Sequence, residues 1–492
     1  MFETVNPLGS KRAIHKIGAI YFVLRNLPDF INFQLSQIHL LALFYSEDAQ
    51  KYGINSILNL IIPDLKLLES QGIEINGANR LFGPISTVVF DNLGGNAIYG
   101  FHESFNSNYY CRLCCTSKDE AQITYKHCYM VLRNKVNYAE HLQGKSFGVQ
   151  RPCALNYLKF FNFLDSPSLD IMHDLLEGGS IRNKTRSSKT YIFKMFRFRK
   201  INQRIISYDY SYLDSKNRPL RLDNNSNRIG QKAAQAWCLI RHLPIIIGDL
   251  IVTSDAKKFW ELILLLLEIL NIVFCRNFSE AILFKLDSLI ITHHSKFKEL
   301  FPENRLIPKH HFMCHYSYVI RQTGPLISLW TMRFEGKHNY FVQLANHTKN
   351  FRNISYTLSI RHQQYAAVMS KNIVLNELKV ENILSIKLCQ FSNPFDAIEL
   401  LRKVNGFEKC DEETEICTTN QIWFNNYNYK HNYIVCFGHD PVFPKFGVIV
   451  EFLITDEKTC YLLLNKLEVQ YFDRHYFSYR GKLKHDGMSY VM

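Results

Sequence analysis

The chain has 492 residues, of which 47% are hydrophobic and 14% aromatic, and its formal net charge is +14. This composition excludes a disordered protein, and the length exceeds that of one ordinary core, so we expect two to four folded units. The positive charge favours an acidic partner, above all nucleic acid. Thirteen cysteines and no secretory signal sequence predict cytosolic or nuclear thiols, some of them metal ligands, rather than disulfides.

The first hundred residues predict strands and one long helix. Two β-rich runs, 17–24 and 37–45, are separated by a breaker region around Pro28 and are expected to be neighbouring strands. Residues 54–71 have apolar positions at helical spacing, and 84–91 is a third β-branched run that ends in Asp91. A carboxylate at the end of a strand is a common catalytic position in α/β folds.

A CxxC pair follows. Cys111 and Cys114 have the spacing with which two thiolates hold a tetrahedral zinc ion from a tight turn. A single pair is only moderately specific, and ordinary buried thiols explain it equally well. The other ligands would come from the cysteines and histidines that follow: Cys115, His127, Cys128, Cys153 and His173.

Residues 168–178 place three carboxylates and a histidine in an otherwise apolar segment. If 170–177 is helical, one face carries Asp170, His173, Asp174 and Glu177, which predicts metal or acid/base chemistry. The opposite, buried face would carry Leu169, Met172, Leu175 and Leu176. An amphipathic helix whose polar face is simply solvated is equally compatible with this pattern.

The second half is basic at first and then helical. Nine Lys or Arg residues and no acid occur between 181 and 204, as in a solvated basic loop or a nucleic-acid contact. Residues 226–330 predict several helices, and the apolar run 259–275 is too short and too acidic for a membrane span. His311, Cys314 and His315 have metal-ligand spacing, although histidines are more often satisfied core or surface groups.

The last part changes character twice. Residues 331–375 predict a helical stretch, in which Glu335 between Arg333 and Lys337 would on its own be a surface ion pair. Residues 376–420 are mixed and predict a linker. Residues 421–492 contain short β-like runs, which predict a small barrel or sandwich.

The order of short motifs along residues 3–375 resembles that of the CACTA-type (Tnp2-like) DNA transposases and the transposon-derived animal proteins related to them. In chain order the motifs are Asn6-Pro-Leu-Gly, Asn26-Leu-Pro28, Asp91, Cys111-x-x-Cys114, Asp170-x-x-His173, Gly324-Pro-Leu326 and Arg333-Phe-Glu335. Each motif is weak alone, and their order and separations together carry the resemblance.

The resemblance implies an α/β fold with an RNase H-like core, N-terminally truncated here, which an all-helical insert interrupts and a small C-terminal β-rich domain follows. In such cores three acids hold two divalent ions, Mg²⁺ or Mn²⁺, for DNA cleavage and strand transfer. Asp91 matches the second acid and Glu335 the third, whereas Glu3 is the nearest acid to the first position and lacks its strand. We therefore expect impaired transposase chemistry. The alternatives are a catalytically inactive DNA- or chromatin-binding protein that retains the fold, and a zinc-stabilised scaffold that does not bind DNA.

The resemblance also joins the Asp170-x-x-His173 element to the CxxC pair. The structural Zn²⁺ ligands that it implies are Cys111, Cys114, Cys153, His173 and Asp170. The expected phosphate contacts are Arg182, Lys184, Arg197, Arg199, Lys200, Arg333, Lys337 and Arg361. The expected partner is DNA, which implies a nuclear location, with no membrane and with a homo-oligomer left open.

These expectations divide the chain into six parts. They are the first part of the core with the CxxC element at 1–180, a basic loop at 181–225, the helical insert at 226–330, a core helix with the last acidic residue at 331–375, the linker at 376–420 and the β-rich domain at 421–492.

Overall fold

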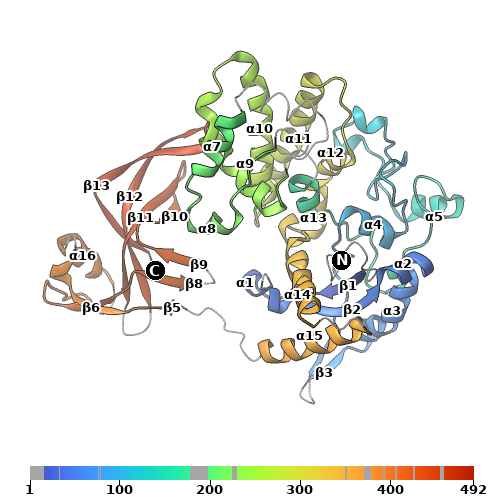
Figure 1. Ribbon diagram of the computed structural model, residues 1–492, viewed down its shortest axis with the longest axis horizontal. Coiled ribbons are helices and arrows are strands. Elements are labelled where there is room, and N and C mark those ends of the chain that lie inside the picture. Colours follow the sequence, from blue (N-terminus) through green and yellow to red (C-terminus); the bar gives the residue numbers. More distant parts are fainter. Residues whose placement is uncertain are drawn as a thin grey trace. The chain divides into compact units, whose positions relative to one another are not determined.

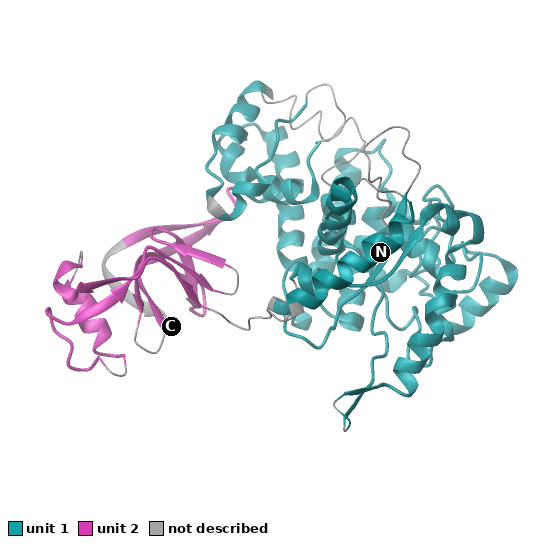
Figure 2. Ribbon diagram, turned by 60° about the horizontal axis from the view of Figure 1, so that its bottom comes forward, with its two compact units in different colours: residues 1–369 teal, residues 370–492 magenta. Residues whose placement is uncertain are grey.

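A computed structural model shows a mixed α/β protein of two compact units, residues 1–369 and 370–492 (Figure 2). The described residues are 16–32, 34–75, 77, 79–177, 198–223, 230–348, 352–370, 378–391, 394–404, 407–424, 427–454 and 459–491. Each unit has its own hydrophobic clusters, as expected for separately packed cores.

The two predicted N-terminal strands are neighbours. β1 (Ile17–Phe22) pairs with β2 (His39–Tyr45) in antiparallel register, with Ile17 opposite Tyr45. Between them lie α1 (Asp29–Asn32) and a 3-10 turn at Leu35–Gln37, and after them come α2 (Ser46–Tyr52), α3 (Ile54–Ser70) and a small hairpin of β3 (Ile73–Ile75) and β4 (Asn79–Leu81). The predicted helix at 54–71 is therefore confirmed.

Helices lie on both faces of the β1–β2 pair (Figure 1). One face packs on α14 (Met332–Thr348) and α15 (Ile354–Ser370) through a cluster that includes Tyr21 and Phe341. The other face packs on α3, through Ile20 and Phe44. Alternate side chains enter opposite sides because successive residues of a strand point to opposite faces.

Residues 84–90, expected to be a third strand, have no strand partner among the described residues. Their side chains nevertheless alternate as in a strand: Val88 and Phe90 join the cluster on α3, while Val89 joins the cluster on α14. The segment therefore lies in the same middle layer as β1 and β2. It delivers Asp91 to the start of α4 (Asn92–Tyr99), which Asp91 caps by accepting the Gly94 amide at 2.5 Å.

The next part of the first unit is built from short turns and then from helices. Short 3-10 turns lie at Glu120–Gln122, His127–Tyr129 and Ala154–Tyr157, and α5 spans Lys135–Gly144. The later helices are α7 (Phe198–Ser207), α8 (Ser211–Asp214), α9 (Ala233–Ile247), α10 (Ser254–Val273), α11 (Glu280–Leu300), α12 (Pro308–Met313) and α13 (Tyr316–Thr323). The described residues between 230 and 330 are therefore largely helical. Among the described residues, no helix is both long enough and apolar enough to cross a membrane.

The second unit is an antiparallel β structure. Five strands follow the order β13 (Ser478–Val491), β12 (Cys460–Asp473), β11 (Pro444–Ile454), β7 (Glu415–Thr418) and β6 (Leu384–Lys387), and β10 (Ile434–His439) also pairs with β11. A second sheet has the order β5 (Lys379–Val380), β8 (Gln421–Phe424) and β9 (Tyr427–Lys430).

Residues 376–420 are not the expected linker. They contribute β5, β6, β7 and α16 (Pro394–Leu401) to the second unit. Leu388, Leu401 and Ile416 are buried there in one cluster, and this burial of apolar surface accounts for their folding with the strands. Acidic residues are frequent from Glu408 to Glu415, as in a solvated segment, but apolar residues on either side of them supply a core.

Candidate metal centre and acidic cluster

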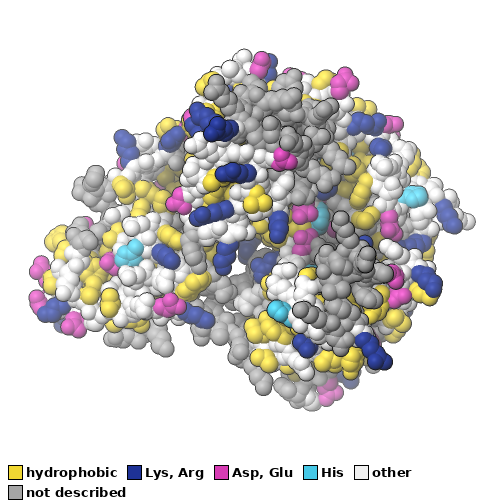
Figure 3. All heavy atoms as spheres, viewed as in Figure 1, with side chains coloured by type: hydrophobic (Ala, Val, Ile, Leu, Met, Phe, Trp, Pro, Cys, Tyr) yellow, Lys and Arg dark blue, Asp and Glu magenta, His cyan; other side chains and the backbone are white. Residues whose placement is uncertain are grey.

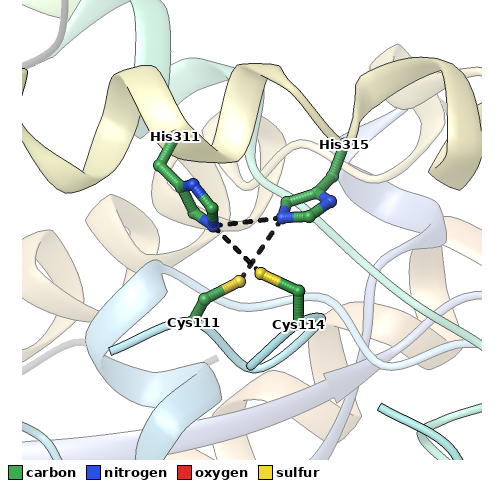
Figure 4. Close-up of side chains that lie close together, drawn as sticks. All are labelled: Cys111, Cys114, His311 and His315. Atoms are coloured by element: carbon green, nitrogen blue, oxygen red, sulfur yellow. Dashed lines mark hydrogen bonds between the residues drawn. The ribbon is translucent and has the colours of Figure 1, made fainter. Parts of the chain in front are cut away.

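Two cysteines and two histidines meet inside the first unit. Cys111 and Cys114 lie in the loop after α4, His311 lies on α12, and His315 is the residue that precedes α13. All four side chains are buried, and they point toward one another (Figure 4). Among the described residues, this is the one group of four His, Cys, Asp or Glu side chains whose ligand atoms all lie within 4.8 Å of one another.

The distances fit a tetrahedral ion. Cys111 Sγ lies 3.5 Å from His315 Nε2, Cys114 Sγ lies 3.2 Å from His311 Nε2, and the two Nε2 atoms are 3.2 Å apart. Zn–S bonds of about 2.3 Å and Zn–N bonds of about 2.0 Å give S···N edges of roughly 3.5 Å and an N···N edge of roughly 3.3 Å. The group could therefore hold a metal ion, and its mixed sulfur and imidazole donors suit zinc.

A second layer of contacts orients these ligands. The Leu113 amide donates to Cys111 Sγ at 3.3 Å, and the Thr116 hydroxyl lies 3.2 Å from Cys114 Sγ. His127 Nδ1 lies 2.9 Å from His315 Nδ1, which leaves His315 Nε2 for the ion. Such outer contacts fix the tautomer and the orientation of metal-binding imidazoles.

The thiols also have the electrostatics of a ligand pair. Burial raises the pKa of both, but hydrogen bonding from Cys114 and the neighbouring imidazoles hold the pKa of Cys111 well below its ordinary value. Burial and the Cys111 thiolate together raise the pKa of Cys114 well above its ordinary value. Burial lowers the pKa of His315, so this imidazole is neutral and can donate a lone pair.

The expected ligand set is corrected in part. Cys153 lies in the hydrophobic cluster around α3, where burial raises the pKa of its thiol to about 11, and His173 and Asp170 belong to a different site. The partners that the structure brings to the CxxC pair are His311 and His315, whose spacing is compatible with metal ligation but is more often that of core or surface histidines. Their i and i+4 separation was the available signal, but it did not show that this helix packs on the CxxC loop.

Asp170 and His173 form a tight pair near the start of α14. His173 Nδ1 and Asp170 Oδ2 are 2.5 Å apart, and Asp170 Oδ1 accepts the amides of Met172 at 3.0 Å and Thr331 at 3.2 Å. The Thr331 hydroxyl also donates to Asp170 Oδ2. Both oxygens of this fully buried carboxylate are therefore engaged, and Asp170 serves to orient His173.

The other edge of His173 faces two carboxylates. Its Nε2 lies 3.5 Å from Glu335 Oε1 and 3.7 Å from Glu177 Oε2. Burial acts to lower the pKa of His173, but the hydrogen bond and charge of Asp170, with the charges of Glu335 and Asp91, outweigh it and raise the pKa to about 9. The imidazole is thus a cation at neutral pH. Asp91 and Glu335, far apart in the sequence, both act on it.

Asp174 does not share this face. Met172–Leu176 form a π-helical turn, in which the Glu177 amide donates to the Met172 carbonyl at 2.9 Å, and Asp174 is fully buried. Asp174 is therefore neither on the expected polar face nor solvated, whereas the predicted buried face is confirmed for Leu169, Met172, Leu175 and Leu176.

A buried network runs from the CxxC loop to Asp174. Arg112, inside the CxxC loop, donates from Nη1 and Nη2 to Asn92 Oδ1, both at 3.1 Å, and its guanidinium lies between the rings of Phe90 and Phe312. Asn92 in turn donates to Asp174 Oδ1 at 2.6 Å. Burial raises the pKa of Asp174 to about 7, against the lowering effect of nearby positive charge. The network thus fixes the buried Asp174 against the CxxC loop.

The expected phosphate contacts are dispersed. Arg199, Lys200 and Arg361 are exposed on α7 and α15, and Figure 3 shows Lys and Arg side chains over the region of α7 and α9. Lys337 is buried and donates to the Leu35 carbonyl at 3.1 Å, and burial lowers its pKa to about 8, so it is corrected to a core residue. Outside the described residues lie Glu3, Arg182, Lys184 and Arg197.

No protein-family model matches the chain, and no match was found among curated proteins.

Proposed function

We propose that this chain is a transposon-derived DNA-binding protein. Its acidic cluster, which comprises Asp91, Asp170, Glu177 and Glu335 around His173, would descend from the metal site of a DDE-type transposase. The observation that carries the proposal is that Glu335 lies 3.5 Å from His173 and that the charges of Glu335 and Asp91 both raise the pKa of this histidine, because the motif order matches these two acids to that site. The order of elements supports it: two paired strands, a helix, an extended segment that ends in Asp91, and Glu335 on a helix after a largely helical stretch. The RNase H-like core and its insert are part of this proposal.

In this account Asp91 and Glu335 would hold Mg²⁺ or Mn²⁺. When bound, such an ion neutralises charge that develops on a phosphodiester group and activates the attacking oxygen. Asp170 cannot supply a further ligand, because both of its oxygens are engaged by His173, Met172 and Thr331. The described residues thus supply a partial carboxylate set, and we expect cleavage to be weak.

One observation favours a binding protein without cleavage. The His173 cation lies between Glu177 and Glu335, and so offsets the negative charge that a divalent ion needs. DNA binding itself needs only positive surface, which the net charge of +14 and the exposed Arg199 and Lys200 provide.

We propose zinc for the Cys111 group, in a structural role. A closed set of four protein ligands leaves no position for water or substrate, as is usual for structural zinc. The ion would join the CxxC loop to α12.

The test uses labelled duplex DNA with the zinc-loaded protein, in Mg²⁺ and in Mn²⁺, over a range of salt concentrations. Glu335→Gln is compared with the control Glu140→Gln, an exposed acid on α5. Binding that weakens with salt, with cleavage lost only in Glu335→Gln, supports the enzyme. Binding without cleavage supports the binding protein. Failure of the unmodified protein to bind DNA even at low salt overturns both.

A further inference from the structure

A pocket of about 490 Å³ lies at the start of α14, within the size range of small-ligand sites. Its walls come from the segment after β1, from α1, from the loop between α10 and α11, and from residues 325–334. Arg333 and Phe334 line it and immediately precede Glu335, and Thr331, which hydrogen bonds to Asp170, follows the lining residue Trp330. The pocket and the acidic cluster therefore share one stretch of backbone.

Three cationic side chains line the pocket. Arg25, Arg276 and Arg333 line it, and no Asp or Glu is among its described lining residues. Arg25 is held in place, because Nη1 donates to Thr87 Oγ1 at 3.0 Å and Nη2 donates to the Thr323 carbonyl at 2.7 Å. Guanidinium groups match the geometry of phosphate oxygens, so these lining side chains suit a phosphate-bearing ligand.

Aromatic side chains also line the pocket. Trp330 is buried and is held edge-on by Trp237, with ring centroids 6.1 Å apart, and by Phe274, with centroids 5.5 Å apart. Phe334 adds a second aromatic ring, and Asn32, Asn277 and Ser328 add hydrogen-bonding groups. Rigid aromatic rings beside amide groups suit a planar heterocycle, which can pack on the ring and use its polar edge.

We infer that this pocket binds one nucleotide, with its phosphate on the arginines and its base against the aromatic wall. The inference rests on the proposed function only for the source of the nucleotide. As part of a DNA strand, it would place an adjoining phosphodiester near Glu335. A free nucleotide offers the same chemistry without any DNA.

The experiment measures the affinity of the zinc-loaded full chain for two labelled probes, a deoxynucleoside monophosphate and a single-stranded deoxyoligonucleotide. Arg276→Gln removes one of the lining arginines, which lies in an exposed loop. Arg218→Gln is the matched control, because Arg218 is also exposed and lies outside the pocket. We expect Arg276→Gln to weaken binding of both probes about tenfold or more, as for the loss of one charge-assisted contact, and Arg218→Gln to bind as the unmodified protein does.

The two probes separate the two proposals. Binding of the mononucleotide without binding of any DNA supports the pocket and overturns the DNA function. Binding of the oligonucleotide that is the same in Arg276→Gln and Arg218→Gln overturns the pocket and leaves DNA binding intact. No binding of either probe overturns the pocket.

Discussion

Among substitutions of the four ligands, replacing Cys114 with serine is the sharpest test of the proposed zinc centre. The change removes one of four donors and puts a poor ligand in its place, while the side-chain volume is almost unchanged. An ion that binds the folded state only adds RT ln(1 + [Zn]/Kd) to the free energy of unfolding. Each tenfold rise in free zinc above Kd should therefore add about 1.4 kcal/mol in the unmodified protein. In Cys114→Ser that slope should be close to zero over the same range.

The assay is urea unfolding in a series of buffers with fixed free zinc. Two cysteine variants serve as controls. Cys115→Ser changes the neighbouring thiol, which is outside the group, and Cys153→Ser changes the thiol that the sequence had favoured as a ligand. Cys153 is buried in an apolar cluster, so its variant should lose stability equally at every zinc concentration.

Two results would refute this reasoning. One is a free energy of unfolding that does not change with free zinc in the unmodified protein. The other is a slope that is lost in Cys153→Ser and kept in Cys114→Ser, which would restore the ligand set expected from the sequence.

Three further predictions concern the groups around the two sites. His127→Gln should weaken zinc binding about 10- to 100-fold, because it removes the contact that orients His315; a zinc affinity equal to that of the unmodified protein would mean that the contact has no such role. The pKa of His173 is raised to about 9 from 6.5, so its contribution of about 3 kcal/mol should be fully present below pH 6.5 and lost as the pH rises through 9. The unfolding free energy of His173→Gln should lack this fall, and parallel pH profiles would contradict the assignment. Arg112→Met should cost about 3–5 kcal/mol, because it removes a buried donor to Asn92 and to the Ser168 carbonyl and leaves Lys309 as the remaining positive neighbour of the buried Asp174. Asp174→Asn in the same chain should recover part of that loss, and full additivity of the two changes in urea unfolding would argue against the coupling.

Local patterns predicted the elements that depend on local order. The strands at 17–22 and 39–45 and the helix at 54–70 follow from apolar periodicity, and the CxxC spacing correctly marked two members of the metal group. Residues 84–90 show what local patterns cannot predict. A strand also needs a neighbouring strand to pair with, and the alternation of side chains does not reveal whether one is present.

The parts that sequence reasoning missed depend on tertiary contacts. His311 and His315 become ligands only because α12 packs against the CxxC loop, about two hundred residues away in the chain. Asp174 turns into the core because the π-helical turn and the Asn92 amide offer it a buried partner, which helical spacing alone does not show. The prediction of a linker at 376–420 was wrong for a similar reason, since apolar residues of this segment are buried by strands later in the chain.

The central claim is that Asp91 and Glu335 together form a divalent-cation site. The direct measurement is Mn²⁺ binding to the zinc-loaded protein, followed by electron paramagnetic resonance, in the unmodified chain and in Asp91→Asn, Glu335→Gln and the control Glu140→Gln. Asn at position 91 can still cap α4, so Asp91→Asn should fold normally. We predict one bound ion that is weakened at least tenfold by either change at the site and unaffected by the control. Mn²⁺ binding that is unchanged in both Asp91→Asn and Glu335→Gln, or no Mn²⁺ binding to the unmodified protein, would contradict the claim.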